Sequence, residues 1–187
     1  MPGSYHRRSI RLRDYDYSRD GAYFITICTY RRECLFGDVI DGEMIPNTIG
    51  CIVEEEWLRS PMVRSYVRLD SFVVMPNHMH GIIILTGDNV GATRPVAPTT
   101  HTSPSHRPKG PTPHSIGAIM AQFKSICTRR INRIRRTPGA PLWQRNYYEH
   151  IIRDEAALNH IRHYTQANPA RWSEDRDYPA NLAPPGS

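Results

Sequence analysis

The sequence predicts an α+β fold of the ferredoxin-like (RRM-like) split βαβ class, in which a central antiparallel sheet carries helices and an extra C-terminal helix follows. The first observation is the order of the segments: strand-like and helical stretches alternate as β-α-β-β-α-β along the 187 residues. The second is an additional helical stretch after the last strand. This class alone does not decide function, because enzymes, RNA binders and regulatory modules share it.

The N-terminal half supplies the first strand, a hairpin and the first helix. Residues 22–30 are rich in β-branched and aromatic side chains, which is typical of a strand. Asp41-Gly42, between two short apolar pairs, predicts a small hairpin. Residues 48–59 predict an amphipathic helix that ends at Ser60-Pro61, with Glu54 to Glu56 largely off its apolar face. That face consists of Ile49, Ile52, Val53 and Trp57.

The second half repeats the pattern around an insertion. Residues 66–75 and 78–85 predict two strands joined at Pro76-Asn77. After residues 86–114, Ser115 caps a predicted helix that ends at Pro138-Gly139. Residues 143–152 predict the last strand, and a final helix runs from Asp154 or Glu155 to about Ala167, before Asn168-Pro169. The apolar stripe of the helix after Ser115 consists of Ile116, Met120, Phe123, Cys127, Ile131 and Ile134.

These features predict one domain over residues 1–187, with a basic arm at 1–20, a flexible Pro/Thr-rich insertion at 86–114 and a short C-terminal tail at 173–187. No apolar run is long enough to cross a bilayer. The four cysteines contain no CxxC pair, and the N-terminus has no secretory signal. We therefore expect a protein of the reducing cytosol.

The positive charge is almost entirely arginine. Lys and Arg number 24 against 18 acidic residues, a formal charge of +6. Codon bias in a GC-rich genome accounts for an arginine excess without any function, but clustering favours binding of a phosphate backbone. The residues that we expect to contact DNA are Arg7, Arg8, Lys124, Arg129, Arg133 and Arg136.

His78-Met79-His80 is the most informative short motif. On a strand, His78 and His80 project to the same face and Met79 to the other. Two surface histidines on a half-exposed strand remain the alternative to a metal site. The apolar residues around the motif indicate a central strand and favour the metal. A hard divalent ion then requires a third ligand, which we expect to offer oxygen.

The final predicted helix offers that ligand beside a hydroxyl. Tyr164 and Asn168 are four residues apart and share a helical face. Taken singly, Tyr164 extends an apolar stripe and Asn168 caps the helix. Together they place a candidate nucleophile about one turn from an amide oxygen. Tyr147 and Tyr148 are rival nucleophiles, but both belong to the predicted strand before this helix.

The motif Met75-Pro76-Asn77-His78-Met79-His80-Gly81 resembles the HUH motif of single-tyrosine insertion-sequence transposases. The stretches 143–155 and 164–169 resemble the branch called REP-associated tyrosine transposases. The resemblance covers roughly residues 15 to 172 apart from the insertion, with two separate motifs in the right order.

The resemblance implies a single-strand DNA endonuclease and strand transferase acting beside a DNA hairpin, often an imperfect palindrome. His78 and His80 then bind Mg²⁺ or Mn²⁺, with Asn168 at the family's third-ligand position. Tyr164 forms a 5′-phosphotyrosine and releases a 3′-OH. The expected place of action is the nucleoid of a prokaryotic cytosol. Both a monomer and a homodimer that shares its active sites remain open.

Two alternatives belong to other classes. One is a non-catalytic RRM-like module that stacks bases on aromatic residues of its sheet, for which Tyr23, Phe24 and Phe72 are the available side chains. The other is a two-histidine phosphoesterase. That class usually has two facing HxT/S motifs, whereas this chain has a single HxH.

Overall fold

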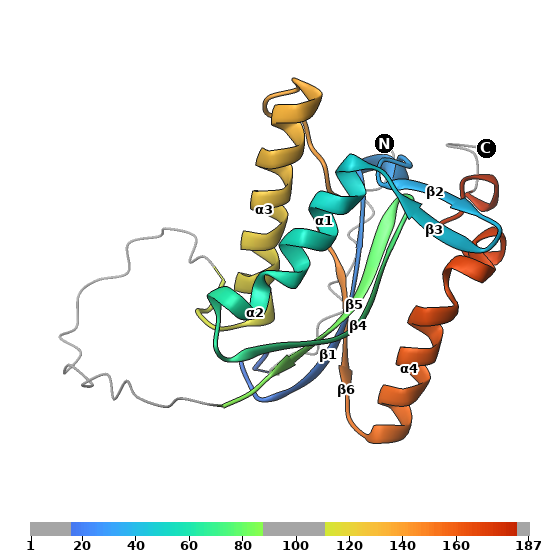
Figure 1. Cartoon of the computed structure of the whole chain (residues 1–187). Helices are drawn as coiled ribbons and strands as arrows, with labels where there is room; N and C mark the ends of the chain where they lie inside the picture. The colour runs from blue at the N-terminus through green and yellow to red at the C-terminus, as the bar shows by residue number, and fades with distance from the viewer. Residues whose placement is uncertain (1–15, 88–110, 183–187) are drawn as a thin grey trace, which may run out of the picture.

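A four-stranded antiparallel sheet forms the centre of the protein, with the strand order β4-β5-β1-β6 (Figure 1). The computed structural model describes residues 16–87 and 111–182. Most of the predicted arm and insertion, with Arg7 and Arg8, lies outside the described residues. The strands are β1 (Gly21–Cys28), β4 (Val67–Met75), β5 (His78–Leu85) and β6 (Tyr148–Ile152).

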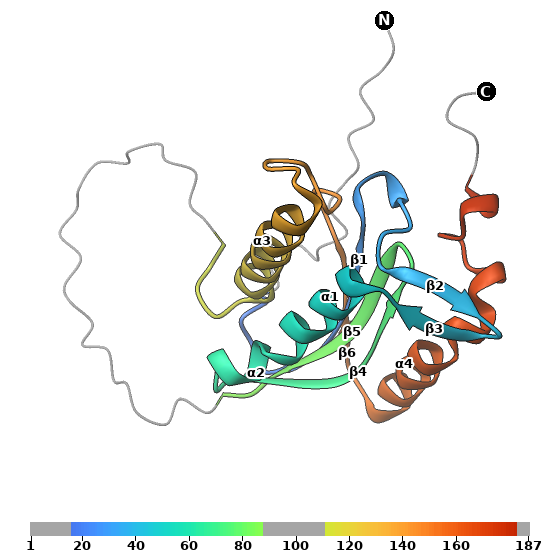
Figure 2. The same ribbon diagram turned by 45° about the horizontal axis from the view of Figure 1, so that its top comes forward.

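The helices cover both faces of this sheet. Helices α1 (Thr48–Leu58), α2 (Ser60–Val63) and α3 (Ile116–Arg135) lie on one side, and α4 (Glu155–Ala167) lies on the other (Figures 1 and 2). We call these two sides the α1/α3 face and the α4 face. The strand order and the two crossover helices confirm the predicted ferredoxin-like α+β class, and the extra helix is present as well.

A separate two-stranded hairpin precedes α1. Strands β2 (Gly37–Ile40) and β3 (Glu43–Pro46) are joined by Asp41 and Gly42, whose φ angles of 52° and 78° are typical of a type I′ turn. The hairpin lies beside the segment that follows α4 (Figure 2), where a Cβ on Gly42 would be 3.4 Å from Cα of Ala170. The part of the chain that the structure describes also contains three 3₁₀ segments: η1 (Tyr30–Arg32), η2 (Pro169–Glu174) and η3 (Pro179–Asn181).

Short polar side chains begin the three long helices. Asn47 Oδ1 accepts hydrogen bonds from the amides of Ile49 and Gly50, and thereby caps α1. Ser115 caps α3 as predicted, through the amide of Ala118. The carboxylate of Asp154 caps α4 through the amide of Ala157. Each cap satisfies amides that the first helical turn leaves without a partner.

The main core fills the α1/α3 face. Trp57 of α1 is fully buried and packs against Gly81 of β5, where a side chain would collide with its ring. Met79 and Ile83 point to the same side as Gly81 and belong to this core. The buried stripe of α3 that meets them consists of Ile116, Ile119, Met120, Phe123, Cys127 and Ile131.

Four details differ from the sequence-based expectation. Ile134 is 53% exposed, because α3 has only one more residue beyond it and has passed the sheet. Glu56 is buried on α1, since it forms an ion pair with Arg130 of α3. Ser60 and Pro61 end α1 but start the short helix α2. The last strand starts at Tyr148, while Trp143 forms an isolated bridge with Thr29.

Within the described residues, no helix combines the length and the apolar character needed to cross a membrane.

Candidate active site

The paired histidines lie on the α4 face of the central strand β5. Both are buried, at 0% exposure for His78 and 5% for His80, and their Nε2 atoms are 3.1 Å apart. Met79 faces the opposite side and packs into the main core, as strand alternation predicts. The HxH motif is therefore not a pair of surface histidines.

Each ring is also held by a hydrogen bond at its other nitrogen. Nδ1 of His80 is 2.8 Å from Oγ1 of Thr26, its cross-strand neighbour on β1. Nδ1 of His78 is 2.9 Å from Oδ1 of Asn77. These contacts direct both Nε2 atoms to one point between the strand and α4.

Helix α4 brings Tyr164 and Asn168 to the same point. Oη of Tyr164 is 3.3 Å from Nε2 of His80, within one chain. The tyrosine ring packs edge-on against Phe24 and is 41% exposed, so it borders both the sheet and solvent. Asn168 follows the last helical residue and is only 4% exposed. The structure thus unites all four residues that the sequence singled out.

Helix α4 is fixed to the sheet by two kinds of contact. Leu158 and Ile161 pack against a small apolar cluster around Ile82. The guanidinium of Arg162 forms a two-bond fork with Asp70 of β4, at 2.9 and 2.7 Å. A β-bulge between Leu69 and Phe72 interrupts the regular register of β4 at Asp70.

The carboxylate of Asp175 completes the cluster, and the sequence analysis missed it. One ligand atom each from His78, His80 and Asp175 lies within 4.8 Å of the others. Asp175 follows η2, inside the segment 173–187 that we predicted to be a tail. Trp172, just before this segment, and Asp177 within it are buried, and Asp177 forms an ion pair with Arg32. No periodicity or motif in the sequence marks this segment as part of a site.

The donor set fits a divalent cation. Asn168 Nδ2 donates to Asp175 at 3.2 Å, which fixes the orientation of the amide. Asn168 Oδ1 is buried and has no hydrogen-bond partner within the described part of the chain. A buried amide oxygen without a partner is costly, and a cation beside the imidazoles would satisfy it. Two imidazole nitrogens with amide and carboxylate oxygens form a mixed nitrogen and oxygen donor set for such an ion.

Burial keeps both imidazoles neutral. Desolvation lowers the pKa of His78 to about 4, although the nearby Asp175 carboxylate opposes the shift. Desolvation and then the neighbouring His78 lower the pKa of His80 well below its usual value. Neutral imidazoles are the form that binds metal. Burial and the Asp175 carboxylate also raise the pKa of Tyr164, so its phenol is protonated at neutral pH.

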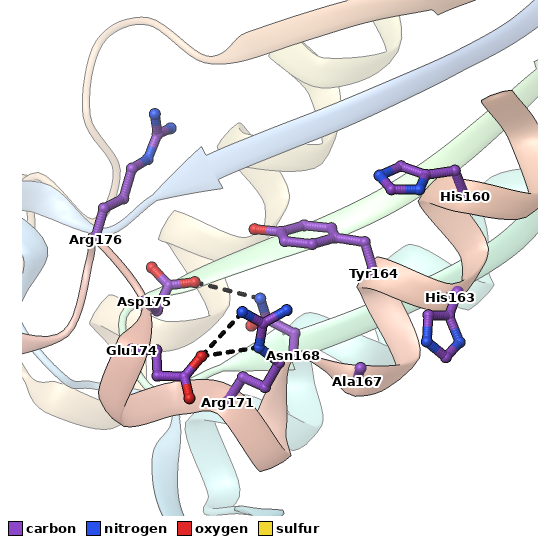
Figure 3. A pocket seen from close by; sticks show the side chains of 9 residues that line it. All are labelled: His160, His163, Tyr164, Ala167, Asn168, Arg171, Glu174, Asp175 and Arg176. Atoms are coloured by element: carbon purple, nitrogen blue, oxygen red, sulfur yellow. Dashed lines mark hydrogen bonds and ion pairs between the residues drawn. The ribbon is translucent and has the colours of Figure 1, made fainter.

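A cavity of about 410 Å³ opens beside Tyr164. Figure 3 shows the phenol of Tyr164 extending across it, with His160 on one side and Asn168 on the other. Its cationic lining comes from Arg171 and Arg176, which sequence reasoning had not selected. Arg171 is paired with Glu174 at 2.9 Å.

The basic residues of α3 lie on the opposite face of the sheet from this cavity (Figure 1). Arg129 and Arg133 are exposed, whereas Arg136 lies beyond the helix in a left-handed conformation with φ of 56°. Lys124 Nζ donates to the carbonyls of Gln144 and Arg145, at 2.6 and 3.0 Å. It therefore holds the chain leading to β6, and DNA contacts by these four residues stay a prediction.

Comparison with solved structures identifies the fold. A REP-associated tyrosine transposase bound to a REP hairpin matches with a TM-score of 0.57 at 20% identity, over 89% of this chain and 76% of that chain. A candidate transposase from Deinococcus radiodurans R1 matches with a TM-score of 0.42 at 18% identity, over 83% and 95%. From the first match, the chain has the fold of a REP-associated tyrosine transposase.

Its family is shown by sequence. An uncharacterized protein from Haemophilus influenzae (strain Rd) is 42% identical over 176 residues, which cover 94% of this chain and 95% of the relative. The chain belongs to the same family as this protein. No protein-family model matches the chain.

Proposed function

We propose that the protein is a metal-dependent single-stranded DNA endonuclease and strand transferase, with Tyr164 as its nucleophile. The observation that carries this proposal is the distance of 3.3 Å between Tyr164 Oη and His80 Nε2 within one chain. A phenol, two neutral imidazoles and an amide oxygen with no partner among the described residues converge there, and these groups suit metal-assisted phosphoryl transfer to a tyrosine.

Four side chains would hold the metal: His78, His80, Asn168 and Asp175. Mg²⁺ or Mn²⁺ bound there would act as a Lewis acid that polarises the scissile phosphate. The protein's own contribution is to keep the imidazoles neutral and to fix the ligands on β5 and on the segment after α4. It also places the phenol next to the ligands before DNA arrives.

The chemistry is a displacement at phosphorus. Tyr164 Oη loses its proton to solvent and forms a bond to the scissile phosphorus, and the bond from phosphorus to the 3′ oxygen breaks. The leaving 3′ oxygen takes up a proton. The products are a 5′-phosphotyrosine and a free 3′-OH, and attack by another 3′-OH reverses the reaction and joins two strands.

The proposed substrate is a single strand beside a DNA hairpin. The solved neighbour of 20% identity was bound to a REP hairpin, and this chain shares its fold. The cavity beside Tyr164 offers Arg171 and Arg176 to the phosphates that flank the cleavage point. Such a substrate places the protein at the nucleoid.

Arg129, Arg133 and Arg136 form a second proposed DNA contact on the α1/α3 side. Their replacement is expected to weaken binding and to reduce the slope of affinity against salt by about 0.9 per lost phosphate contact. The metal site should be unaffected because α3 does not contribute to it. Arg7 and Arg8, which lie outside the described residues, are also proposed to contact DNA.

The alternative of base stacking on an open sheet has little support. Tyr23 is fully buried in the main core, and Phe24 is covered by α4 at 8% exposure. Phe72 is half-buried and packs against the same core. An RRM-like surface needs such rings to be exposed.

The test is formation of a covalent DNA adduct. Full-length protein is incubated with labelled hairpin-bearing single strands and Mn²⁺ or Mg²⁺, and the products are separated under denaturing conditions. We expect a protein–DNA adduct that disappears with EDTA. In Tyr164→Phe we expect a loss of about three orders of magnitude or more, whereas Tyr148→Phe is the matched control. An adduct of normal yield in Tyr164→Phe would assign the nucleophile elsewhere.

A further inference from the structure

The hydrogen bonds at Nδ1 of His78 and His80 differ, and this difference determines which ring nitrogen of each histidine carries the proton. Asn77 is fully buried, and its Nδ2 donates to the carbonyl oxygens of Asp177 and Arg32, at 2.7 and 3.1 Å. With two acceptors at Nδ2, the amide has one orientation, and its Oδ1 faces His78. An amide oxygen only accepts. His78 Nδ1 therefore carries a proton, and His78 Nε2 presents a lone pair.

The hydrogen-bond partner of His80 does not fix which of its ring nitrogens carries the proton. Thr26 is 4% exposed, and its hydroxyl lies 2.8 Å from Nδ1 of His80. A hydroxyl donates or accepts equally well, so Thr26 can serve either tautomer of this ring.

The two Nε2 atoms are 3.1 Å apart, so one of them must carry a proton and donate it to the other. Two lone pairs at this distance repel, so in the absence of a cation one nitrogen must donate to the other. His78 Nε2 cannot donate, because its ring proton is on Nδ1. His80 then carries its proton on Nε2 and accepts from Thr26 at Nδ1.

We propose that Asn77 and Thr26 are positioning residues with different tasks: Asn77 fixes the tautomer of His78, and Thr26 allows His80 to exchange tautomers when metal binds. On binding, His80 releases the Nε2 proton to solvent and takes one up at Nδ1, so its net charge is unchanged. The Thr26 hydroxyl then turns from donor to acceptor. The second half of this inference rests on the proposed metal site, and the first half does not.

Histidine nitrogen NMR of the ¹⁵N-labelled full chain tests both halves, because the two tautomers have distinct nitrogen shifts. With EDTA, we expect His78 protonated at Nδ1 and His80 at Nε2. With saturating Mg²⁺, we expect His78 unchanged and His80 protonated at Nδ1. A metal-free His78 protonated at Nε2 overturns the role of Asn77. A His80 that keeps its Nε2 proton while Mg²⁺ shifts other site resonances overturns the role of Thr26.

Failure of the metal site would look different. In that case Mg²⁺ would shift no resonance of His78, His80 or Asn168. The metal-free spectrum would still decide the tautomer that Asn77 imposes, and metal-free protonation of His80 at Nδ1 would contradict the role of Thr26.

Variants separate positioning from folding. Thr26→Val keeps the shape but removes the hydroxyl, and we expect a loss of Mn²⁺ affinity of about 10- to 100-fold by calorimetry. Thr26→Ser should restore it. Thr165→Val is the matched control, since Thr165 is also buried and its hydroxyl has no partner among the described residues. Equal Mn²⁺ affinity in Thr26→Val and wild type would overturn the proposal.

Discussion

The central strand β5 contributes side chains to both faces of the sheet, and the two faces differ in the residues that it places there. On the α1/α3 face, β5 contributes Met79, Gly81 and Ile83 to a large apolar core. On the α4 face, it contributes His78 and His80, and only a small cluster around Phe24, Ile82 and Ile152. A strand anchored by apolar burial on one side can carry buried imidazoles on the other, because the core offsets their desolvation.

The difference also separates stability from function. Disturbing the packing of the α1/α3 face should lower the stability of the fold, whereas substitutions on the α4 face should mainly alter the site. Substitutions and pH changes that act on one face at a time test this division.

Gly81→Ala should disrupt the α1/α3 face most. A Cβ at this position would lie 2.4 Å from Cζ2 of the buried Trp57, so ring or strand must move. We expect the free energy of unfolding to fall by about 3 kcal/mol, measured by urea denaturation. Adding Trp57→Phe should recover part of the loss. Full stability of Gly81→Ala alone would show that this face tolerates repacking.

Acid should destabilise the α4 face of the metal-free protein. The pKa of His78 falls from 6.5 in an unfolded chain to about 4 on folding, and that of His80 also falls. The unfolded state therefore binds more protons, and stability is lost as the pH drops from about 6.5 towards 4. Melting temperatures in EDTA should show this slope. His80→Asn should flatten it.

The Asp70–Arg162 fork should matter more for function than for stability. The pair is partly exposed, so Arg162→Gln should lower the free energy of unfolding by about 1 kcal/mol or less. Adduct formation should fall more clearly, because the fork sets the position of α4 and hence of Tyr164. The control is Arg68→Gln, because Arg68 is an exposed arginine on β4, the strand that carries Asp70. Equal adduct yields in both variants would mean that the apolar contacts of α4 suffice.

Thr165→Val should have the smallest effect and the opposite sign. Its hydroxyl is fully buried on α4 without a hydrogen-bond partner among the described residues. An isosteric methyl group removes that cost, so we expect a gain of about 1 kcal/mol or less. Thermal melting measures it, and adduct formation should be unchanged. A loss of stability would indicate a bound water at this hydroxyl.

The sequence predicted the α1/α3 face better than the α4 face. The stripe of α3 up to Ile131 and the hairpin at Asp41-Gly42 depend on local periodicity and turn chemistry, and both were found. The site residues Tyr164 and Asn168 also have a local signal, their four-residue spacing. Asp175 has none, since it reaches His78 and His80 from a segment about 100 residues away. Asn77 belongs to the motif around His78, but its amide is oriented by the carbonyl of Asp177, 100 residues away. Lys124 was selected for its charge, but the backbone carbonyls that it contacts are brought close to it only by the tertiary fold.

On the proposed function, one chain holds a complete site on the α4 face. It is tested by mixing Tyr164→Phe with His80→Ala at equal concentrations, in the presence of hairpin DNA and Mn²⁺. Since Tyr164 lies 3.3 Å from His80 of its own chain, the mixture should form no more adduct than either variant alone. Recovery of the adduct in the mixture would show that the tyrosine of one chain serves the histidines of another, and would contradict the account.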